Sequence, residues 1–542
     1  PDPLSRAAKV LFGLDYLYPY QRLVIANILE AACVAGKRVR WPWEGGNGDG
    51  PEADGGALSD APEGALSGAA EIEDSGEMGR QLVILPTGAG KSLCFQLPAQ
   101  LLEGPTLVIY PILSLMADQE RRLASLGFAP VQIRGGQSAG EREELFRRIR
   151  SGESRFIIAN PEVLITPKVL KELESLNIFH LVIDEAHCVS EWGESFRPSY
   201  LEIHSIIKAS RCPLVTAFTA TASSPVLEGI ERRVFGGGGV HRVIGNPGRI
   251  NISYEAKGCI LKNIAVRDLL IARKRPAIVF CSSRKGTETL SRYLRFELEG
   301  TAAKGQSEIY FYHAGLEREE KKNVETWFLG SQEGVLCATC AFGLGVDKAD
   351  IRTVIHRDCP STVEAYLQES GRAGRDGKNA EALLLFGPDD ERRLARMGGV
   401  QKERFLRLLD YARNSERCRR KTLLSLLDYQ GEAEIPDGFC CDVCERKKAG
   451  AKPGHSGYRE EKSVLDFFSR NKRRCTLSEA AREMEQAGTI RWTETDAKEI
   501  IRYLLAAGRL KEGKSFLWKG KLTCKKVQPS SRLRSSSSSP VT

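Results

Sequence analysis

The chain has 542 residues, of which 42% are hydrophobic and 27% are charged, and its formal net charge at pH 7 is +9. This length is too great for one hydrophobic core, so about three or four domains are expected. No stretch approaches the ~18 consecutive apolar residues of a membrane-spanning helix and no N-terminal segment has the pattern of a secretion signal, so we expect a soluble intracellular protein without membrane contact.

The positive charge is unevenly distributed along the chain. Residues 41–80 contain ten acidic side chains and one basic side chain, so the rest of the chain is more basic than the net charge of +9 indicates. A folded body of this kind favours a polyanionic partner such as nucleic acid.

The first eighty residues predict two helices followed by an acidic insertion. Helical spacing of apolar residues covers 7–35, with a break at residues 12–15 and a second helix that opens near Gln21. Residues 41–80 are rich in Gly, Ala, Asp and Glu, with almost no large apolar side chain after Trp43. Such a segment cannot bury enough surface to offset its ordering entropy, so it is predicted to be disordered.

A glycine-rich turn follows the acidic segment. Residues 85–92 (Leu-Pro-Thr-Gly-Ala-Gly-Lys-Ser) stand between a short apolar run and a helical stretch. In such a turn the backbone N–H groups and the helix N-terminus favour a bound phosphate. Lys91 would contact the β- and γ-phosphates and Ser92 would ligate Mg²⁺, although the stricter form of the motif has a glycine where Leu85 stands. The loop residues expected to bind the nucleotide are Thr87, Gly88 and Gly90.

Apolar runs alternate with helical stretches in two successive blocks. The strands predicted in the first block are 81–84, 106–110, 156–159, 181–183 and 214–218. Those predicted in the second block are 277–280, 309–312, 335–338, 353–355 and 382–385. Buried strands that alternate with helices indicate parallel α/β sheets, and two such blocks predict two lobes with a cleft between them.

Charged residues at the ends of these blocks suit phosphoryl chemistry. Asp184 and Glu185 follow a predicted strand and therefore lie at the carboxyl edge of the sheet, where such sheets bind ligands. Asp184 suits Mg²⁺ beside Ser92, and Glu185 suits a base that orients the attacking water. Arg372 and Arg375 in the second block would stabilise charge on the transferred phosphoryl group from across the cleft, with Arg375 favoured as the arginine finger.

Residues 9–445 resemble the RecQ-type helicases of superfamily 2 through an ordered series of motifs. The matching stretches are 12–21, 85–96, 110–119, 160–162, 184–198, 219–222, 280–284, 338–348 and 368–377. This resemblance implies an α/β fold of two tandem RecA-like parallel-sheet lobes, a helical zinc-binding subdomain and a winged-helix-like domain. It further implies that Gln21 reads the adenine base and that Gln368 belongs to the nucleotide site. Tyr18 stands where the family usually has an arginine.

An aromatic segment follows the two carboxylates. Trp192, Phe196 and Arg197 resemble the loop by which the family couples single-stranded DNA to ATP hydrolysis. Bases stack on aromatic side chains with about 1–3 kcal/mol each, and an arginine adds a cation beside the strand. We therefore expect these three residues to bind DNA, with core packing as the alternative for the two aromatic side chains.

Most of the fifteen cysteines stand singly within apolar runs, which favours reduced thiols over a disulfide framework. Four of them differ, because Cys418 precedes a helical stretch and Cys440, Cys441 and Cys444 follow about twenty residues later. Four thiolates at this spacing can close a tetrahedral zinc site. They resemble the RecQ zinc-binding subdomain, although the adjacent pair departs from its commonest spacing.

The C-terminal residues 462–522 predict a winged helix. Its helices are expected over 463–470, 477–485 and 494–507, and its hairpin over 509–511 and 516–518 with a turn at Gly513. The family carries such a module here to grip duplex DNA at a fork. A winged helix that contacts protein is the alternative.

These observations predict five segments. They are lobe 1 (1–245, with the insertion 41–80), lobe 2 (246–392), the zinc-binding subdomain (393–448), the winged-helix-like domain (460–525) and a disordered tail (526–542).

The predicted function is that of an ATP-dependent DNA helicase that uses ATP, Mg²⁺ and Zn²⁺. By resemblance, it would move 3′→5′ on single-stranded DNA and unwind forked duplexes in DNA repair or recombination. Its protein partners would include single-strand-binding or recombination proteins, in the cytoplasm with the nucleoid of a bacterium or in the nucleus of a eukaryote. The alternatives are an RNA helicase of the DEAH type and an ATP-switched DNA clamp that does not unwind.

Overall fold

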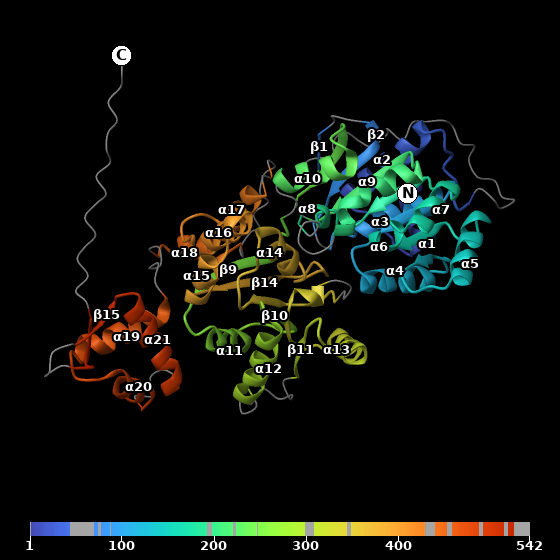
Figure 1. Ribbon diagram of the computed structural model, residues 1–542. Coiled ribbons are helices and arrows are strands. Elements are labelled where there is room, and N and C mark those ends of the chain that lie inside the picture. Colours follow the sequence, from blue (N-terminus) through green and yellow to red (C-terminus); the bar gives the residue numbers. More distant parts are fainter. Residues whose placement is uncertain are drawn as a thin grey trace, which may run out of the picture.

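The computed structural model describes residues 2–43, 70–73, 77–86, 88–191, 198–220, 224–246, 248–298, 308–343, 348–427, 429, 440–451, 458–486, 492–513 and 519–524. Two α/β blocks follow one another along the chain, and a small C-terminal domain lies beside the second block (Figure 1). Among the helices of these residues, none has both the length and the apolar composition needed to cross a membrane.

The first block is built on an eight-stranded sheet in the order β1-β8-β2-β7-β6-β3-β5-β4. Its strands are β1 (Ala70–Glu73), β2 (Glu77–Ile84), β3 (Thr106–Ile109), β4 (Val131–Ile133), β5 (Phe156–Ala159), β6 (His180–Ile183), β7 (Leu214–Thr219) and β8 (Val240–Gly245). All neighbours are parallel except β1, which is antiparallel to β8. This confirms the predicted parallel α/β architecture.

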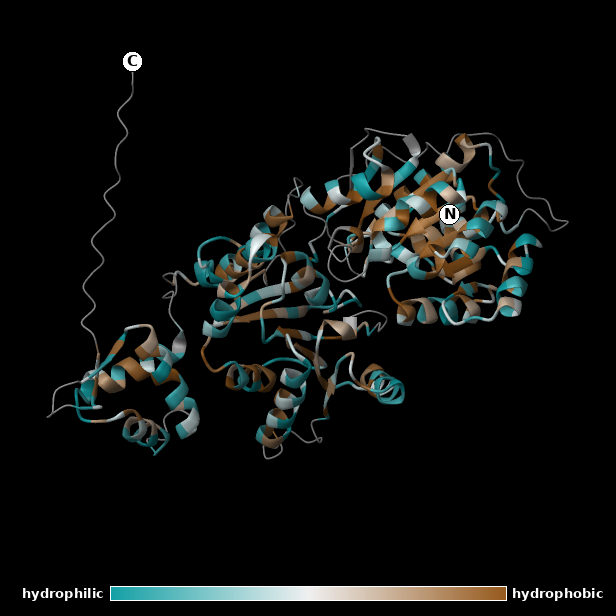
Figure 2. Ribbon diagram, viewed as in Figure 1, coloured by the Kyte–Doolittle hydropathy of each residue, from teal (hydrophilic) through white to brown (hydrophobic). Residues whose placement is uncertain are grey.

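Helices cover both faces of this sheet, as a parallel sheet requires. One face packs against α1 (Pro3–Phe12), α2 (Pro19–Val34), α3 (Lys91–Leu101) and α4 (Leu113–Ser125). The other packs against α5 (Ala139–Arg150), α6 (Pro161–Leu164), α7 (Pro167–Ser175), α8 (Cys188–Glu191), the short helix η1 (Pro198–Glu202), α9 (Ile203–Ser210) and α10 (Ser224–Phe235). Hydrophobic residues are concentrated along the strands between these layers (Figure 2).

The prediction that the acidic segment 41–80 is disordered is wrong at both ends of the segment. Trp41 and Trp43 stack on each other with ring centroids 5.4 Å apart, and the Arg6 guanidinium lies 4.3 Å from the centroid of the Trp43 ring. At the other end, residues 70–73 form β1 and residues 77–80 belong to β2. These strands form because their backbones pair with neighbouring strands, and the acidic composition of the segment does not predict that pairing. Residues 44–69 lie outside the described residues.

The second block is a six-stranded parallel sheet in the order β11-β12-β10-β13-β14-β9. Its strands are β9 (Ile252–Gly258), β10 (Ala277–Phe280), β11 (Ile309–Tyr312), β12 (Val335–Ala338), β13 (Thr353–His356) and β14 (Ala380–Phe386). Its helices are α11 (Lys262–Ala272), α12 (Arg284–Leu298), α13 (Arg318–Gly330), η2 (Cys340–Gly343), α14 (Val363–Ser370) and α15 (Pro388–Ala395). The predicted boundary between residues 392 and 393 falls inside α15.

The helices after this sheet form two further groups. The first group, α16 (Gly399–Arg413), α17 (Arg419–Leu426) and α18 (Asp442–Lys448), packs into the same hydrophobic cluster as α14. The second group consists of α19 (Arg459–Arg470), α20 (Leu477–Gln486), α21 (Glu494–Ala506) and the antiparallel pair β15 (Leu510–Glu512) and β16 (Leu522–Cys524). Three helices and a two-stranded ribbon were predicted here.

The predicted pairing of the hairpin is corrected, because its predicted second strand, 516–518, lies outside the described residues and another segment pairs with β15. The strand that pairs with β15 is β16, and the Gly513 N–H donates to the Lys521 carbonyl at 2.8 Å. The aromatic residues between Ser515 and Lys519 favoured the earlier segment, because aromatic side chains are enriched in strands. Residues 514–518 themselves lie outside the described residues.

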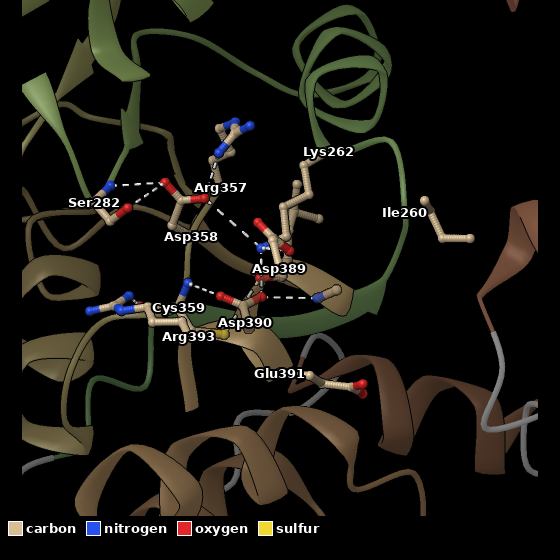
Figure 3. A network of polar contacts seen from close by, with 12 residues as sticks. Ile260, Lys262, Ser282, Arg357, Asp358, Cys359, Asp389, Asp390, Glu391 and Arg393 are labelled. Carbon is tan, nitrogen blue, oxygen red and sulfur yellow. Dashed lines mark hydrogen bonds and ion pairs between the residues drawn. The ribbon is translucent and has the colours of Figure 1, made fainter. Parts of the chain in front are cut away.

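A buried ion cluster stands where the second sheet approaches the C-terminal domain (Figure 3). The Lys262 side chain is 2% exposed, and its Nζ lies 2.5 Å from Asp390, 3.0 Å from Asp389 and 3.9 Å from Asp358. Burial by itself would lower the pKa of Lys262, but the three carboxylates, chiefly Asp390, raise it. The lysine is therefore charged, and it joins the start of α11 to the start of α15.

Replacing Lys262 with Met should lower the free energy of unfolding of this part of the protein by about 3–5 kcal/mol, because the buried carboxylates lose their cation. Denaturant titration followed by tryptophan fluorescence would measure the loss. Lys9→Met is a matched control, since the pair of Lys9 with Asp15 is exposed and should contribute little. Equal small effects of the two substitutions would contradict the role given to Lys262.

A cavity of about 1100 Å³ lies beside this cluster, between α11, α15 and α21. Its lining includes Leu261, Arg357, Glu391, Asp496 and Tyr503. No residue of the first sheet lines it, so the cavity is separate from the glycine-rich turn after β2.

Candidate active site

The glycine-rich turn between β2 and α3 is shaped to approach other groups closely. Gly88 and Gly90 have φ values of 83° and 72°, in the left-handed region that favours glycine. A Cβ atom at Gly90 would lie 2.5 Å from Gln21 Nε2, and one at Gly88 would lie 2.9 Å from Arg249 Nη1. Side chains at these two positions would therefore obstruct the turn.

The start of α3 faces this turn. The helix begins at Lys91, with Ser92 in its first turn, so its N-terminal dipole favours an anion at the glycines. Lys91 Nζ lies 3.4 Å from the Leu85 carbonyl oxygen, to which it donates. Thr87, the other predicted loop residue, lies outside the described residues.

Two carboxylates follow the end of β6, two strands away from β2 in the sheet. Asp184 is buried, and its Oδ1 accepts a hydrogen bond from the Glu185 N–H at 3.0 Å. Burial and the neighbouring charge of Glu185 raise the pKa of Asp184, against the effect of Lys91. A divalent cation would relieve this cost, so a buried carboxylate of this kind fits an Mg²⁺ ligand.

The pKa of Glu185 is shifted in the opposite direction, below its ordinary value. Burial would raise its pKa, but the charges of Lys91, His187, Arg372 and Arg375 lower it. Its backbone has φ = 51°, and its Oε2 lies 3.4 Å from His187 Nδ1. His187 Nδ1 also lies 3.2 Å from Thr219 Oγ1, which links the end of β6 to the end of β7.

The arginine loop, residues 371–377 between α14 and β14, faces the glycine-rich turn from the second block. Arg375 Cγ lies 3.4 Å from the position of a Cβ at Gly88, and the charges of Arg372 and Arg375 both act on Glu185. The structure thus brings the arginine loop of the second block to the glycine-rich turn and to Glu185 of the first block. Gln368 lies on α14 just before this loop and is partly buried.

Gln21 joins the N-terminal segment to the turn. Its Nε2 donates to the Ala89 carbonyl at 2.9 Å, and its Oε1 accepts from the Tyr18 N–H at 3.0 Å. The Tyr18 ring is stacked on Tyr20, with ring centroids 5.4 Å apart and planes at 4°, and Tyr16 meets Tyr18 edge-on at 5.6 Å. Tyr18 remains 53% exposed.

Sequence reasoning missed this aromatic stack. The signal was three tyrosines spaced two residues apart, at positions 16, 18 and 20, where the chain enters α2, since side chains two apart share one side of an extended chain. Sequence reasoning also missed Arg249, between β8 and β9, which no spacing distinguished from other surface arginines.

The predicted DNA-binding residues Trp192, Phe196 and Arg197 lie outside the described residues. The chain is described up to Glu191, at the end of α8, and again from Pro198, at the start of η1.

Four cysteines converge where α17 and α18 begin. The sulfur atoms of Cys418, Cys440, Cys441 and Cys444 all lie within 4.8 Å of one another. Cys418 Sγ is 3.7 Å from Cys440 Sγ and 4.0 Å from Cys441 Sγ. Tetrahedral zinc with Zn–S bonds of about 2.3 Å places its sulfur ligands about 3.8 Å apart. The four thiols therefore fit Zn²⁺, and the buried Cys440 turns into the cluster with its neighbour.

Comparisons with known protein families place two regions of the chain. Residues 69–229 match the DEAD/DEAH box helicase family, and residues 261–377 match the helicase conserved C-terminal domain. These two matches cover most of the first and second sheets.

Two curated proteins show the relationship over longer stretches. The chain is 37% identical over 358 residues to the probable ATP-dependent DNA helicase RecS of Bacillus subtilis. This alignment covers 64% of this chain and 70% of RecS. The chain is 34% identical over 388 residues to the ATP-dependent DNA helicase RecQ of Pasteurella multocida. This alignment covers 70% of this chain and 59% of that protein. The chain thus spans less than two thirds of the second relative.

Among solved structures, the DUF1998 helicase MrfA bound to DNA is similar with a TM-score of 0.53 and 17% identity. The alignment covers 96% of this chain and 62% of MrfA. At this identity the similarity shows the fold alone.

Proposed function

The chain belongs to the RecQ-type DNA helicases of superfamily 2, and on this basis we propose that it hydrolyses ATP to move along single-stranded DNA and to unwind duplexes. The observation that carries the proposal is the approach of Arg375 from the second lobe to Gly88 of the first, with the charges of both loop arginines acting on Glu185. A site completed by two lobes links the state of the nucleotide to the position of the lobes. We propose the 3′→5′ direction by resemblance to the family.

In this proposal, lobe 1 holds the nucleotide and activates water. Lys91 contacts the β- and γ-phosphates, and Ser92 and Asp184 hold Mg²⁺, which would neutralise charge on the phosphates. Glu185 orients the attacking water as a base. The charges of Lys91, His187 and the two loop arginines support this role, because they lower the pKa of Glu185 and so favour the ionised carboxylate that a base requires.

Lobe 2 completes the site. Arg372 and Arg375 stabilise the charge that develops on the transferred phosphoryl group, and such an arginine contributes about 10³–10⁵-fold to the rate. Arg375 is the proposed finger because it reaches Gly88. Closure of the lobes on ATP and their release after hydrolysis would step them along the strand.

The base of the nucleotide would bind beside Gln21. Gln21 is fixed against the turn by its bond to Ala89, and the exposed ring of Tyr18 offers a flat surface next to it. Stacking on Tyr18 would replace the contact of the arginine that the family usually has at this position. Gln368 would complete the nucleotide site from lobe 2.

The cysteine cluster is proposed as a structural zinc site. Four thiolates would fill all four positions of a tetrahedral ion, so none is left open for catalysis. Zinc would fix the start of α17 to the start of α18.

DNA is the proposed polyanionic partner of the basic chain. Single strands would cross both lobes and stack on Trp192 and Phe196 beside Arg197, and the three-helix C-terminal domain with its ribbon would bind the duplex at a fork. Single-strand-binding or recombination proteins are the proposed protein partners, and DNA repair or recombination the proposed process.

Unwinding of three duplexes with equal cores tests the function. With ATP and Mg²⁺, the protein should separate forked and 3′-tailed DNA but not 5′-tailed DNA. ATP hydrolysis stimulated by RNA alone would identify an RNA helicase of the DEAH type instead. ATP consumption without strand separation on any of the substrates would identify a DNA clamp.

A further inference from the structure

A fully buried arginine connects the cysteine cluster to the segment between the lobes. Arg420 is 2% exposed, and its guanidinium donates to the carbonyls of Arg249 at 2.7 Å, Ile250 at 3.5 Å and Ile252 at 2.7 Å. These carbonyls belong to the inter-lobe linker, which we define as the described residues 248–251 immediately before β9 of the second sheet, and to the first residue of β9. A buried cation is costly unless hydrogen-bonded, so these bonds fix the linker backbone firmly.

The base of Arg420 is itself fixed by the cysteine cluster. Cys418 is the N-cap residue of α17 and stands two residues before Arg420. From the other side of the cluster, the Cys440 carbonyl accepts a hydrogen bond from the Tyr254 N–H of β9 at 3.4 Å. The Arg420 guanidinium also lies 5.4 Å from the centroid of the Tyr254 ring. The linker end of β9 is therefore held by both the cluster and Arg420.

The linker in turn grips the arginine loop. Arg249 donates from Nη2 to the Gly374 carbonyl at 2.7 Å and from Nη1 to the Gly371 carbonyl at 3.3 Å. Asn251 Nδ2 donates to the Gly374 carbonyl at 2.8 Å and to the Lys378 carbonyl at 2.9 Å. Gly374 permits this approach, because it has φ = 55° and a Cβ there would lie 2.6 Å from Asn251 Nδ2.

The same Arg249 side chain reaches the first lobe. Its Nη1 lies 2.9 Å from the position of a Cβ at Gly88, so the guanidinium stands at the mouth of the glycine-rich turn. Arg375 also lies at this turn. Burial lowers the pKa of Arg249 most, and the charge of Arg375 lowers it further. Two arginines whose charges act on each other at this turn favour an anion beside them.

We propose that Arg249 is a third catalytic arginine, which contacts the nucleotide phosphates, and that Arg420 is the positioning residue that holds it there. The cysteine-cluster subdomain thereby sets the geometry of the ATP site from outside that site. The inference rests on the proposed function, since it takes the turn at Gly88 as the phosphate-binding site. The physical basis is preorganisation, because a guanidinium fixed through both its backbone and its side chain needs no reorganisation when charge develops.

A double-mutant cycle tests this relay. Arg249→Ala should lower the kcat of DNA-stimulated ATP hydrolysis by about 10²–10³-fold, as expected for loss of one phosphate-stabilising donor. Arg420→Lys keeps the charge but not the fork of donors, and should lower kcat by about 10–10²-fold through misplacement of Arg249. In the Arg249→Ala background, Arg420→Lys should have no further effect on kcat.

The matched control is Arg419→Lys. Arg419 is the neighbouring residue, is equally buried, and donates to Asp442 and to the carbonyls of α16 rather than to the linker. Its substitution should lower the melting temperature by as much as Arg420→Lys but leave kcat within about twofold of the wild type. Melting curves of all variants separate a folding defect from the kinetic effect.

The outcomes distinguish this inference from the proposed function. A wild-type protein without DNA-stimulated ATP hydrolysis would overturn both. With an active wild type, equal losses of kcat from Arg420→Lys in the presence and absence of Arg249 would overturn the relay alone. Wild-type kinetics of Arg249→Ala would overturn the assignment of Arg249.

Discussion

Replacing Lys91 with alanine should abolish ATP hydrolysis while leaving the affinity for single-stranded DNA close to that of the wild type. Lys91 begins α3 at the glycine-rich turn, and its charge acts on both Asp184 and Glu185. The substitution removes a fixed cation from the place where negative charge develops on the phosphates. A loss of at least about 10²–10³-fold in kcat is expected.

Steady-state ATP hydrolysis at saturating single-stranded DNA would measure this loss. Fluorescence anisotropy at one fixed salt concentration would measure DNA affinity, because binding to a polyanion depends strongly on salt. Lys208→Ala, on the exposed side of α9, is the control and should behave as the wild type in both assays. Unchanged hydrolysis by the Lys91 variant would refute the assignment of the phosphate-binding turn.

Replacing Cys444 with serine should remove zinc and destabilise the helices that follow lobe 2. The four sulfurs lie within 4.8 Å of one another, close enough for one ion to bind all of them, and α17 and α18 both begin at the cluster. Structural zinc contributes folding free energy directly, so losing one of four ligands should cost several kcal/mol. The melting temperature of this region should fall by roughly 10 °C.

Elemental analysis of the purified protein would give the zinc content, and calorimetry would give the melting curve. Cys33→Ser is the matched control, because Cys33 is exposed on α2, far from the cluster in the chain. It should leave one zinc per chain and an unchanged transition. A Cys444→Ser protein with full zinc content and wild-type melting would disprove the zinc site.

Most of the strands that the sequence predicted in the two parallel sheets are buried on both faces, and β11 is the exception because Tyr310 is 40% exposed. Runs such as Leu107–Ile109 and Ile278–Phe280 are continuously apolar because helices cover both sides of a parallel sheet. Five strands of the described residues were missed: the short strands β1 and β16, and the strands β4, β8 and β9. β4 has three residues, β8 carries His241 and Arg242, and β9 ends in charged positions, so none of them forms an apolar run.

The residues of the candidate site also fall into two groups, those that a local sequence pattern predicted and those that it did not. Lys91, Asp184, Glu185 and the two loop arginines were predicted because each stands in a local pattern that phosphate chemistry requires. Arg249 was not, because its place depends on backbone carbonyls 122 and 125 positions away in the sequence, which no local pattern reports. The stack of Tyr18 on Tyr20 depends likewise on the path of the chain before α2.

The short strand β1 has a consequence for how the molecule behaves at high concentration. It occupies the outer side of β8, whose backbone N–H and C=O groups would otherwise form an open template for a strand of another chain. The C-terminal part of the acidic segment therefore covers the edge of the sheet at β8. Shortening it within residues 44–69 should preserve solubility, whereas a deletion that extends through residue 73 should cause self-association, which light scattering would detect.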